Sequence, residues 1–99
     1  MANLQARLMA AGLERDLRKA VGHDQVKVQP RGRNMLILMD LGEETEVIGR
    51  ITQFGPRLFG AAYRSHTGRW DPLPVEGSRE EAIEAVVSML GPYLSPENY

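Results

Sequence analysis

The sequence contains no cysteine, which excludes a disulfide framework, a thiolate metal site and a cysteine nucleophile. It also lacks any apolar run close to the roughly 20 residues that a membrane-spanning helix needs. The N-terminal segment 1–11 has no long apolar stretch of the kind that marks a secretory signal. Together these absences predict a cytoplasmic protein that does not enter a membrane.

Size and composition limit what the chain can enclose. The 99 residues are 42% hydrophobic and 25% charged, which is typical of one ordinary globular domain spanning 1–99. A domain of this size buries only about 60–65% of the surface that its unfolded chain exposes. We therefore expect one core, little room for a deep active site, and binding at a surface.

Motifs for catalysis or metal binding are scarce. Ser65, His66 and Asp71 include the residue types of a nucleophile triad, but adjacent side chains on a strand point apart, and no glycine-flanked nucleophile turn surrounds the serine. His23 and His66 do not lie in a spaced ligand pattern. The sequence therefore predicts a protein that is not an enzyme and has no metal or cofactor.

Two amphipathic helices are indicated, one at each end of the chain. The first has apolar residues at mostly helical spacing from Leu4 to Val21, followed by Gly22 as a C-terminal cap. The second begins after Gly77, where Ser78 and Glu81 have the spacing of a capping box. Each helix has one apolar stripe, so each should pack against a common layer.

Four strand candidates lie between the helices, at 25–29, 35–41, 46–53 and 58–64, each bounded by turn residues. Their short connections require antiparallel neighbours in the order 1-2-3-4. The predicted fold is a two-layer α+β domain, a four-stranded antiparallel meander with both helices on one face (αββββα). After the fourth strand, Trp70 is predicted to fold over the end of the core, with Pro72 and Pro74 in an extended return to the last helix.

Alternation along the strands predicts two apolar faces. With turns centred near Gly32, between Glu43 and Glu44, and between Gly55 and Pro56, one face collects small and branched residues and forms the floor of the core: Val26, Val28, Leu36, Leu38, Val47, Gly49, Ile51, Leu58, Gly60 and Ala62. A solvated face of an antiparallel sheet is usually polar. The second face is not, and two helices can cover only one face.

This second face is the predicted functional surface. Large exposed apolar patches commonly mark protein interfaces, in which methionine and aromatic residues are frequent. The sequence thus favours an interaction or adaptor module that forms a homodimer or binds another protein. The alternative cover is the C-terminal tail 93–99. The predicted interface residues are Met35, Ile37, Met39, Ile48, Phe59 and Tyr63, with Arg50 as a polar contact.

A second hypothesis is single-stranded nucleic-acid or anion binding. Phe59 and Tyr63 would stack on bases, and five cationic residues would contact phosphates: Lys27, Arg50, Arg57, Arg64 and Arg69. Domains that bind nucleic acid are usually clearly basic. Here the net charge is −1 and the sequence pI is about 6.1, so the protein interface is favoured over this alternative.

Overall fold

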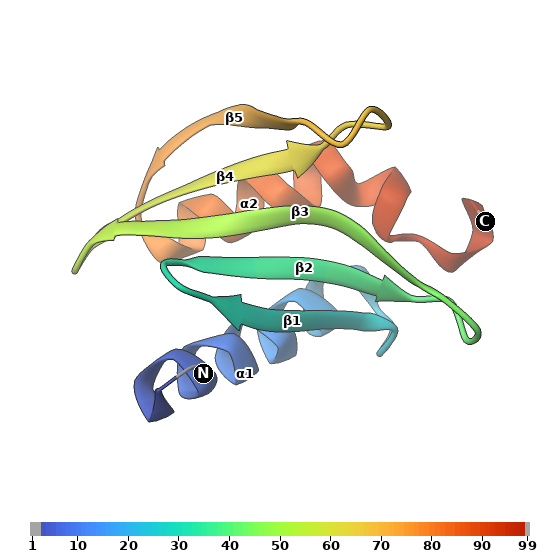
Figure 1. Ribbon diagram of the computed structural model, residues 1–99, viewed down its shortest axis with the longest axis horizontal. Coiled ribbons are helices and arrows are strands. Elements are labelled where there is room, and N and C mark those ends of the chain that lie inside the picture. Colours follow the sequence, from blue (N-terminus) through green and yellow to red (C-terminus); the bar gives the residue numbers. More distant parts are fainter. Residues whose placement is uncertain (1–2, 99) are drawn as a thin grey trace.

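A helix, an antiparallel meander and a second helix follow one another along the chain in the computed structural model, which describes residues 3–98 (Figure 1). The strands lie in sequence order in one five-stranded sheet. This confirms the α+β class and the helix–meander–helix order. The elements are α1 (Leu4–Val21), β1 (Val26–Arg31), β2 (Asn34–Asp40), β3 (Thr45–Gly55), β4 (Leu58–Arg64), β5 (Trp70–Gly77), α2 (Arg79–Leu90), and the 3-10 helices η1 (Gly91–Leu94) and η2 (Pro96–Asn98).

The prediction of four strands is corrected by β5. Trp70 pairs with Arg64 and Pro72 pairs with Ala62, so the segment predicted as an extended return is the fifth strand of the sheet. Proline has no amide hydrogen, so it is disfavoured in a central strand, where both sides of the backbone form hydrogen bonds with neighbouring strands. An edge strand tolerates proline because its outer side has no neighbouring strand to bond. The position of β5 at the edge is what makes its two prolines compatible with pairing.

Both helix starts are capped by side chains. Asn3 Oδ1 accepts from the amide of Ala6 at 2.8 Å, and Ser78 with Glu81 forms the predicted capping box of α2. Gly22 ends α1 in the left-handed conformation, with φ 83°. Among residues 3–98, no helix is long and apolar enough to cross a membrane.

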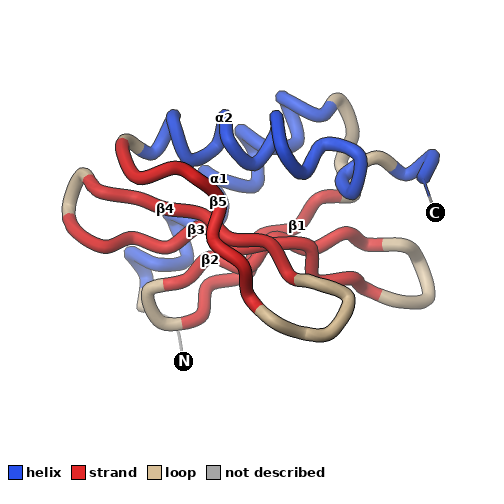
Figure 2. The backbone as a smooth tube through the Cα atoms, turned by 90° about the horizontal axis from the view of Figure 1, so that it is seen from above, coloured by secondary structure: helices blue, strands red, loops and turns tan. Residues whose placement is uncertain are grey.

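The core lies between the helices and one face of the sheet, and Figure 2 shows α2 running along that side of the sheet. Leu13 and Leu17 of α1 and Val86 of α2 are fully buried against it. Leu4 and Leu8 are exposed, although Ala6 and Met9 from the same turns of α1 pack against the core. The sheet contributes Val26, Met35, Ile37, Met39, Ile48, Ile51, Phe59, Ala61 and Leu73.

The predicted assignment of the sheet faces is wrong. The first turn is centred between Gly32 and Arg33, since Arg31 pairs with Asn34, and this places Val28 opposite Ile37. Irregularities in the β2–β3 and β3–β4 pairings shift the later registers as well. A shift of one residue exchanges the faces of a strand. The face predicted to be open is therefore the one that the helices cover.

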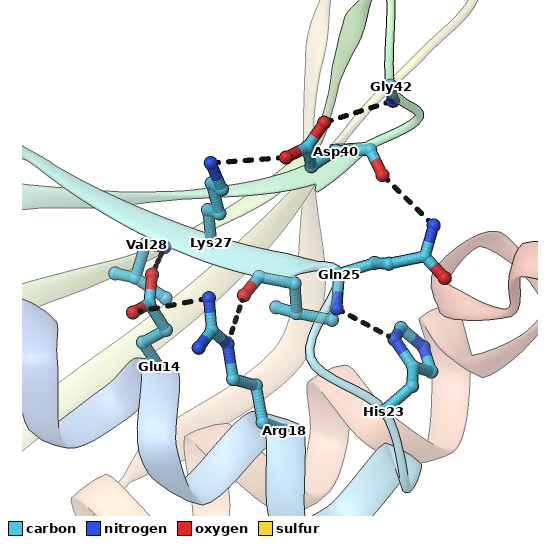
Figure 3. A network of polar contacts seen from close by, with 9 residues as sticks. Glu14, Arg18, His23, Gln25, Lys27, Val28, Asp40 and Gly42 are labelled. Atoms are coloured by element: carbon cyan, nitrogen blue, oxygen red, sulfur yellow. Dashed lines mark hydrogen bonds and ion pairs between the residues drawn. The ribbon is translucent and has the colours of Figure 1, made fainter.

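The outer edge of β1 is occupied by side chains of α1 (Figure 3). Glu14 Oε1 accepts from the backbone amide of Val28 at 2.9 Å, and Arg18 Nε donates to the carbonyl of Val26 at 2.8 Å. An ion pair of 3.5 Å joins Arg18 to Glu14. These contacts satisfy backbone groups that an edge strand otherwise presents to another strand.

Candidate functional site

One face of the sheet has no helix of residues 3–98 packed on it, and we call it the helix-free face. Its members alternate with the core residues along each strand and pair with one another across strands: Leu36 is opposite Arg50, and Arg50 is opposite Ala62. It also carries Trp70 and Arg64, which pair with each other on β5 and β4. Further members are Lys27, Gln29, Arg31, Asn34, Leu38, Asp40, Val47, Thr52, Leu58, Gly60 and Glu76.

The floor of this face is apolar and almost closed. Leu36 is 8% exposed, Leu38 9% and Ala62 7%, although none of them belongs to the core cluster under the helices. The ring of Phe54, itself 56% exposed, lies over Gly60, where an added Cβ would be 2.7 Å from the ring atom Cε2. Side chains of the face itself, rather than another element, therefore shield this floor from water.

Two arginines contact the indole ring of Trp70. The guanidinium carbon of Arg50 lies 4.5 Å from the ring centroid, and that of Arg64 lies 5.3 Å from it. Both distances are within the range of cation–π attraction. We call this arrangement the Arg50–Trp70–Arg64 stack. Arg50 Nε is buried and has no hydrogen-bond partner among the described residues. The cation–π contact with the Trp70 ring partly offsets the loss of water around this guanidinium group.

The charges on the helix-free face are mostly positive. Four cationic residues lie on it: Lys27, Arg31, Arg50 and Arg64. It carries two carboxylates, those of Asp40 and Glu76. Lys27 Nζ lies 3.1 Å from Asp40 Oδ2 (Figure 3).

A hydrogen bond from the amide of Gly42, with Lys27 as a second cause, holds the pKa of Asp40 below its ordinary value. The Asp40 carboxylate is therefore ionised at neutral pH, where it forms its ion pair with Lys27. Within residues 3–98, no carboxylate lies at ion-pair distance from Arg50 or Arg64.

Five of the predicted interface residues do not lie on an open face. Their exposed fractions are between 0% and 6%, and all five belong to the core cluster beneath the helices: Met35, Ile37, Met39, Ile48 and Phe59. Tyr63 lies at the end of that same side and is 37% exposed. Arg50 lies on the opposite face. The predicted apolar contacts share a face, as expected, but it is the covered one.

The residues of the nucleic-acid alternative are dispersed. Arg57 lies in the β3–β4 turn and Arg69 in the β4–β5 loop, whereas Lys27 and Arg64 lie on the helix-free face. Buried Phe59 cannot offer its ring to a base.

Trp70 was predicted to fold over the end of the core, but it is the aromatic centre of the helix-free face. The signal in the sequence was Arg64, which precedes Trp70 by six residues, because a tight turn between them brings the guanidinium close to the indole ring.

Ser65 has a local structural role in the β4–β5 loop. Its hydroxyl accepts from the amide of Arg69 at 3.1 Å and shares a 2.9 Å hydrogen bond with the Thr67 hydroxyl. Across residues 3–98, no group of three or more histidine, cysteine, aspartate or glutamate side chains is placed to hold a metal ion.

The helices are linked to each other by a salt bridge that lies outside the helix-free face. Arg79 Nη2 of α2 donates to Asp16 Oδ2 of α1 at 2.7 Å. This hydrogen bond, with a smaller contribution from Arg15, holds the pKa of Asp16 below its ordinary value of 3.8 despite partial desolvation. The contact links the two helices on the side of the sheet that they cover.

Comparison with known proteins finds no matching family model, no matching curated protein and no matching solved structure. The interpretation of the helix-free face therefore depends on its own geometry and chemistry.

Proposed function

We propose that the protein is a non-catalytic interaction module that binds another polypeptide on the helix-free face of its sheet. One observation carries the proposal. The sheet is packed by helices on one side, and its other side carries the Arg50–Trp70–Arg64 stack above an apolar floor.

The residue types at this centre support protein binding. Tryptophan and arginine dominate the energetics of protein interfaces, particularly where less important contacts surround them and exclude water. Trp70 is partly buried, and Leu36 and Ala62, which lie opposite Arg50 on the neighbouring strands, are nearly sealed already, as is Leu38. A partner that covers the stack would desolvate a small central area with little rearrangement of the backbone.

The edges of the sheet favour binding on the face. Glu14 and Arg18 already hydrogen-bond to the outer side of β1. The other edge strand, β5, includes Pro72 and Pro74, which have no amide hydrogen to donate to an added strand. A partner would therefore contact side chains of the sheet rather than extend its hydrogen-bond ladder.

Site-specific photo-crosslinking tests the proposal. A benzophenone amino acid replaces Gln29, which is exposed on the helix-free face, or Lys19, which is exposed on α1 as the matched control. After irradiation in the source cells, we expect a protein adduct from position 29, none from position 19, and loss of the adduct when Trp70→Ala is added. An adduct of twice the chain mass would identify the predicted homodimer.

Two results would contradict the proposed surface: no adduct from position 29, or equal adducts from both positions. Single-stranded nucleic-acid binding stays an alternative, with fewer supporting observations because Phe59 is buried and Tyr63 lies on the helix side.

A further inference from the structure

The helix-free face combines unpaired guanidinium groups with an excess of positive charge, and we infer that its partner is an acidic peptide segment whose carboxylates bind Arg50 and Arg64 beside Trp70. This inference rests on the proposed function and specifies the chemistry of the partner. It follows from the donors of the two arginines, from the charge of the face, and from the apolar floor next to them.

The two guanidinium groups have donors without acceptors among residues 3–98. Arg50 Nε is shielded from water and lacks a partner, and no carboxylate among the described residues pairs with Arg50 or Arg64. Contact with the indole ring restrains both side chains. A restrained arginine loses less entropy on binding, and its planar fork matches the two oxygens of a carboxylate. The stack is thus organised for a carboxylate before the partner arrives.

The charge of the face argues against a second copy as the partner. Four cations and two carboxylates lie on it, and one of those carboxylates, Asp40, is already paired with Lys27. Two such faces brought together would place positive charge against positive charge, which opposes association. With an acidic segment as the partner, the electrostatic interaction is attractive and favours association.

A peptide fits the surface better than a nucleic acid. Single-stranded nucleic acids bind through successive aromatic platforms, but Trp70 is already contacted by two guanidinium groups and Phe59 lies in the core. The floor formed by Leu36, Leu38 and Ala62 offers contact to aliphatic side chains, which a peptide has and a phosphate backbone lacks.

Trp70 is the only tryptophan of the chain, so its fluorescence reports directly on the stack. The experiment titrates the full chain with three blocked nonapeptides and with a ten-nucleotide oligothymidylate. The peptides have leucine and serine at the same positions. At the remaining positions one peptide has glutamate, the second glutamine and the third lysine. The double variant Arg50→Gln with Arg64→Gln removes the proposed contacts. The matched control, Arg7→Gln with Lys19→Gln, removes two charges from exposed positions of α1.

We expect saturable binding of the glutamate peptide, weaker binding as salt is raised, and a loss of affinity of about tenfold or more in the stack variant but not in the control. Circular dichroism of both variants confirms that they are folded. Absence of saturable binding, equal binding of the glutamine peptide, or tighter binding of the oligothymidylate would each overturn the inference. If the peptide experiment fails but the photo-crosslinker at position 29 still gives a protein adduct, the proposed function stands and only the acidic partner is overturned. If position 29 gives no adduct either, the proposed function and this inference are both overturned.

Discussion

The two faces of the sheet reach similarly low exposure by different means. Ile37 and Ile51 on the covered face are 0% and 1% exposed because α1 and α2 pack over them. Leu36 and Leu38, one residue away along β2, are 8% and 9% exposed beneath side chains of their own sheet. A side chain can rotate away to admit a partner, whereas a helix can be displaced only by partial unfolding. Low exposure alone therefore does not distinguish a core from a lightly shielded surface.

Adjacent truncations on β2 should separate the two faces most strongly. Ile37→Ala removes side-chain volume from a site closed by helices and should lower the free energy of unfolding by about 3 kcal/mol. Leu36→Ala should lower it by about 1.5 kcal/mol, because neighbouring side chains and water can fill the space. Urea unfolding measures both values. Equal losses would show that the helix-free face is packed as tightly as the core.

Two glycines provide the next comparison. A Cβ at Gly49 would lie 2.8 Å from the backbone oxygen of Ala62 and 3.0 Å from Leu90 of α2, so Gly49→Ala should cost about 2 kcal/mol. A Cβ at Gly60 meets only the movable ring of Phe54 at less than 3 Å, and Gly60→Ala should cost less than about 1 kcal/mol. Thermal unfolding of the two variants gives the order, and a reversed order would contradict the face assignment.

The link between the helices should have a smaller, pH-dependent effect. Asp16→Asn removes the ion pair with Arg79, in which both side chains are about a third exposed, and should cost about 1 kcal/mol at pH 7. Because the folded-state pKa of Asp16 is lowered, the contribution is present above the ordinary value of 3.8 and is lost as pH falls through the folded-state pKa. Denaturant titrations of the unmodified protein and of Asp16→Asn, at pH 7 and well below pH 3.8, test this. A difference in stability between the two proteins that persists at the lower pH would mean that the carboxylate charge is not responsible.

The smallest effect on stability is expected at the stack. Arg50→Gln removes one cation–π contact and also a buried donor without a partner, so the free energy of unfolding should change by less than about 1 kcal/mol. The emission of Trp70 should nevertheless shift. A large loss of stability would show that Arg50 supports the fold rather than a binding surface.

Local signals in the sequence predicted much of the fold. The capping box of Ser78 and the glycine after α1 each depend on a few neighbouring residues, and both predictions are confirmed. The faces of the sheet depend on register, which one residue in a turn or one bulge changes. Met35 and Phe59 were therefore grouped correctly with one another, yet placed on the wrong side of the sheet.

The candidate site was harder to predict for the same reason. Arg50 and Trp70 are 20 positions apart, and their contact requires the β3–β4 and β4–β5 pairings together with the small side chain of Ala62 between them. The prolines of β5 concealed the strand that carries Trp70. No spacing within the sequence reports a contact that forms across three strands.

The contacts of Glu14 and Arg18 with β1 also have a consequence for synthesis of the chain. During translation α1 leaves the ribosome before β1, so the groups that occupy the strand edge are present before the edge itself. A newly made sheet with a free edge can pair with neighbouring chains and aggregate. The order of α1 and β1 along the chain thus gives the nascent protein its own protection against that pairing.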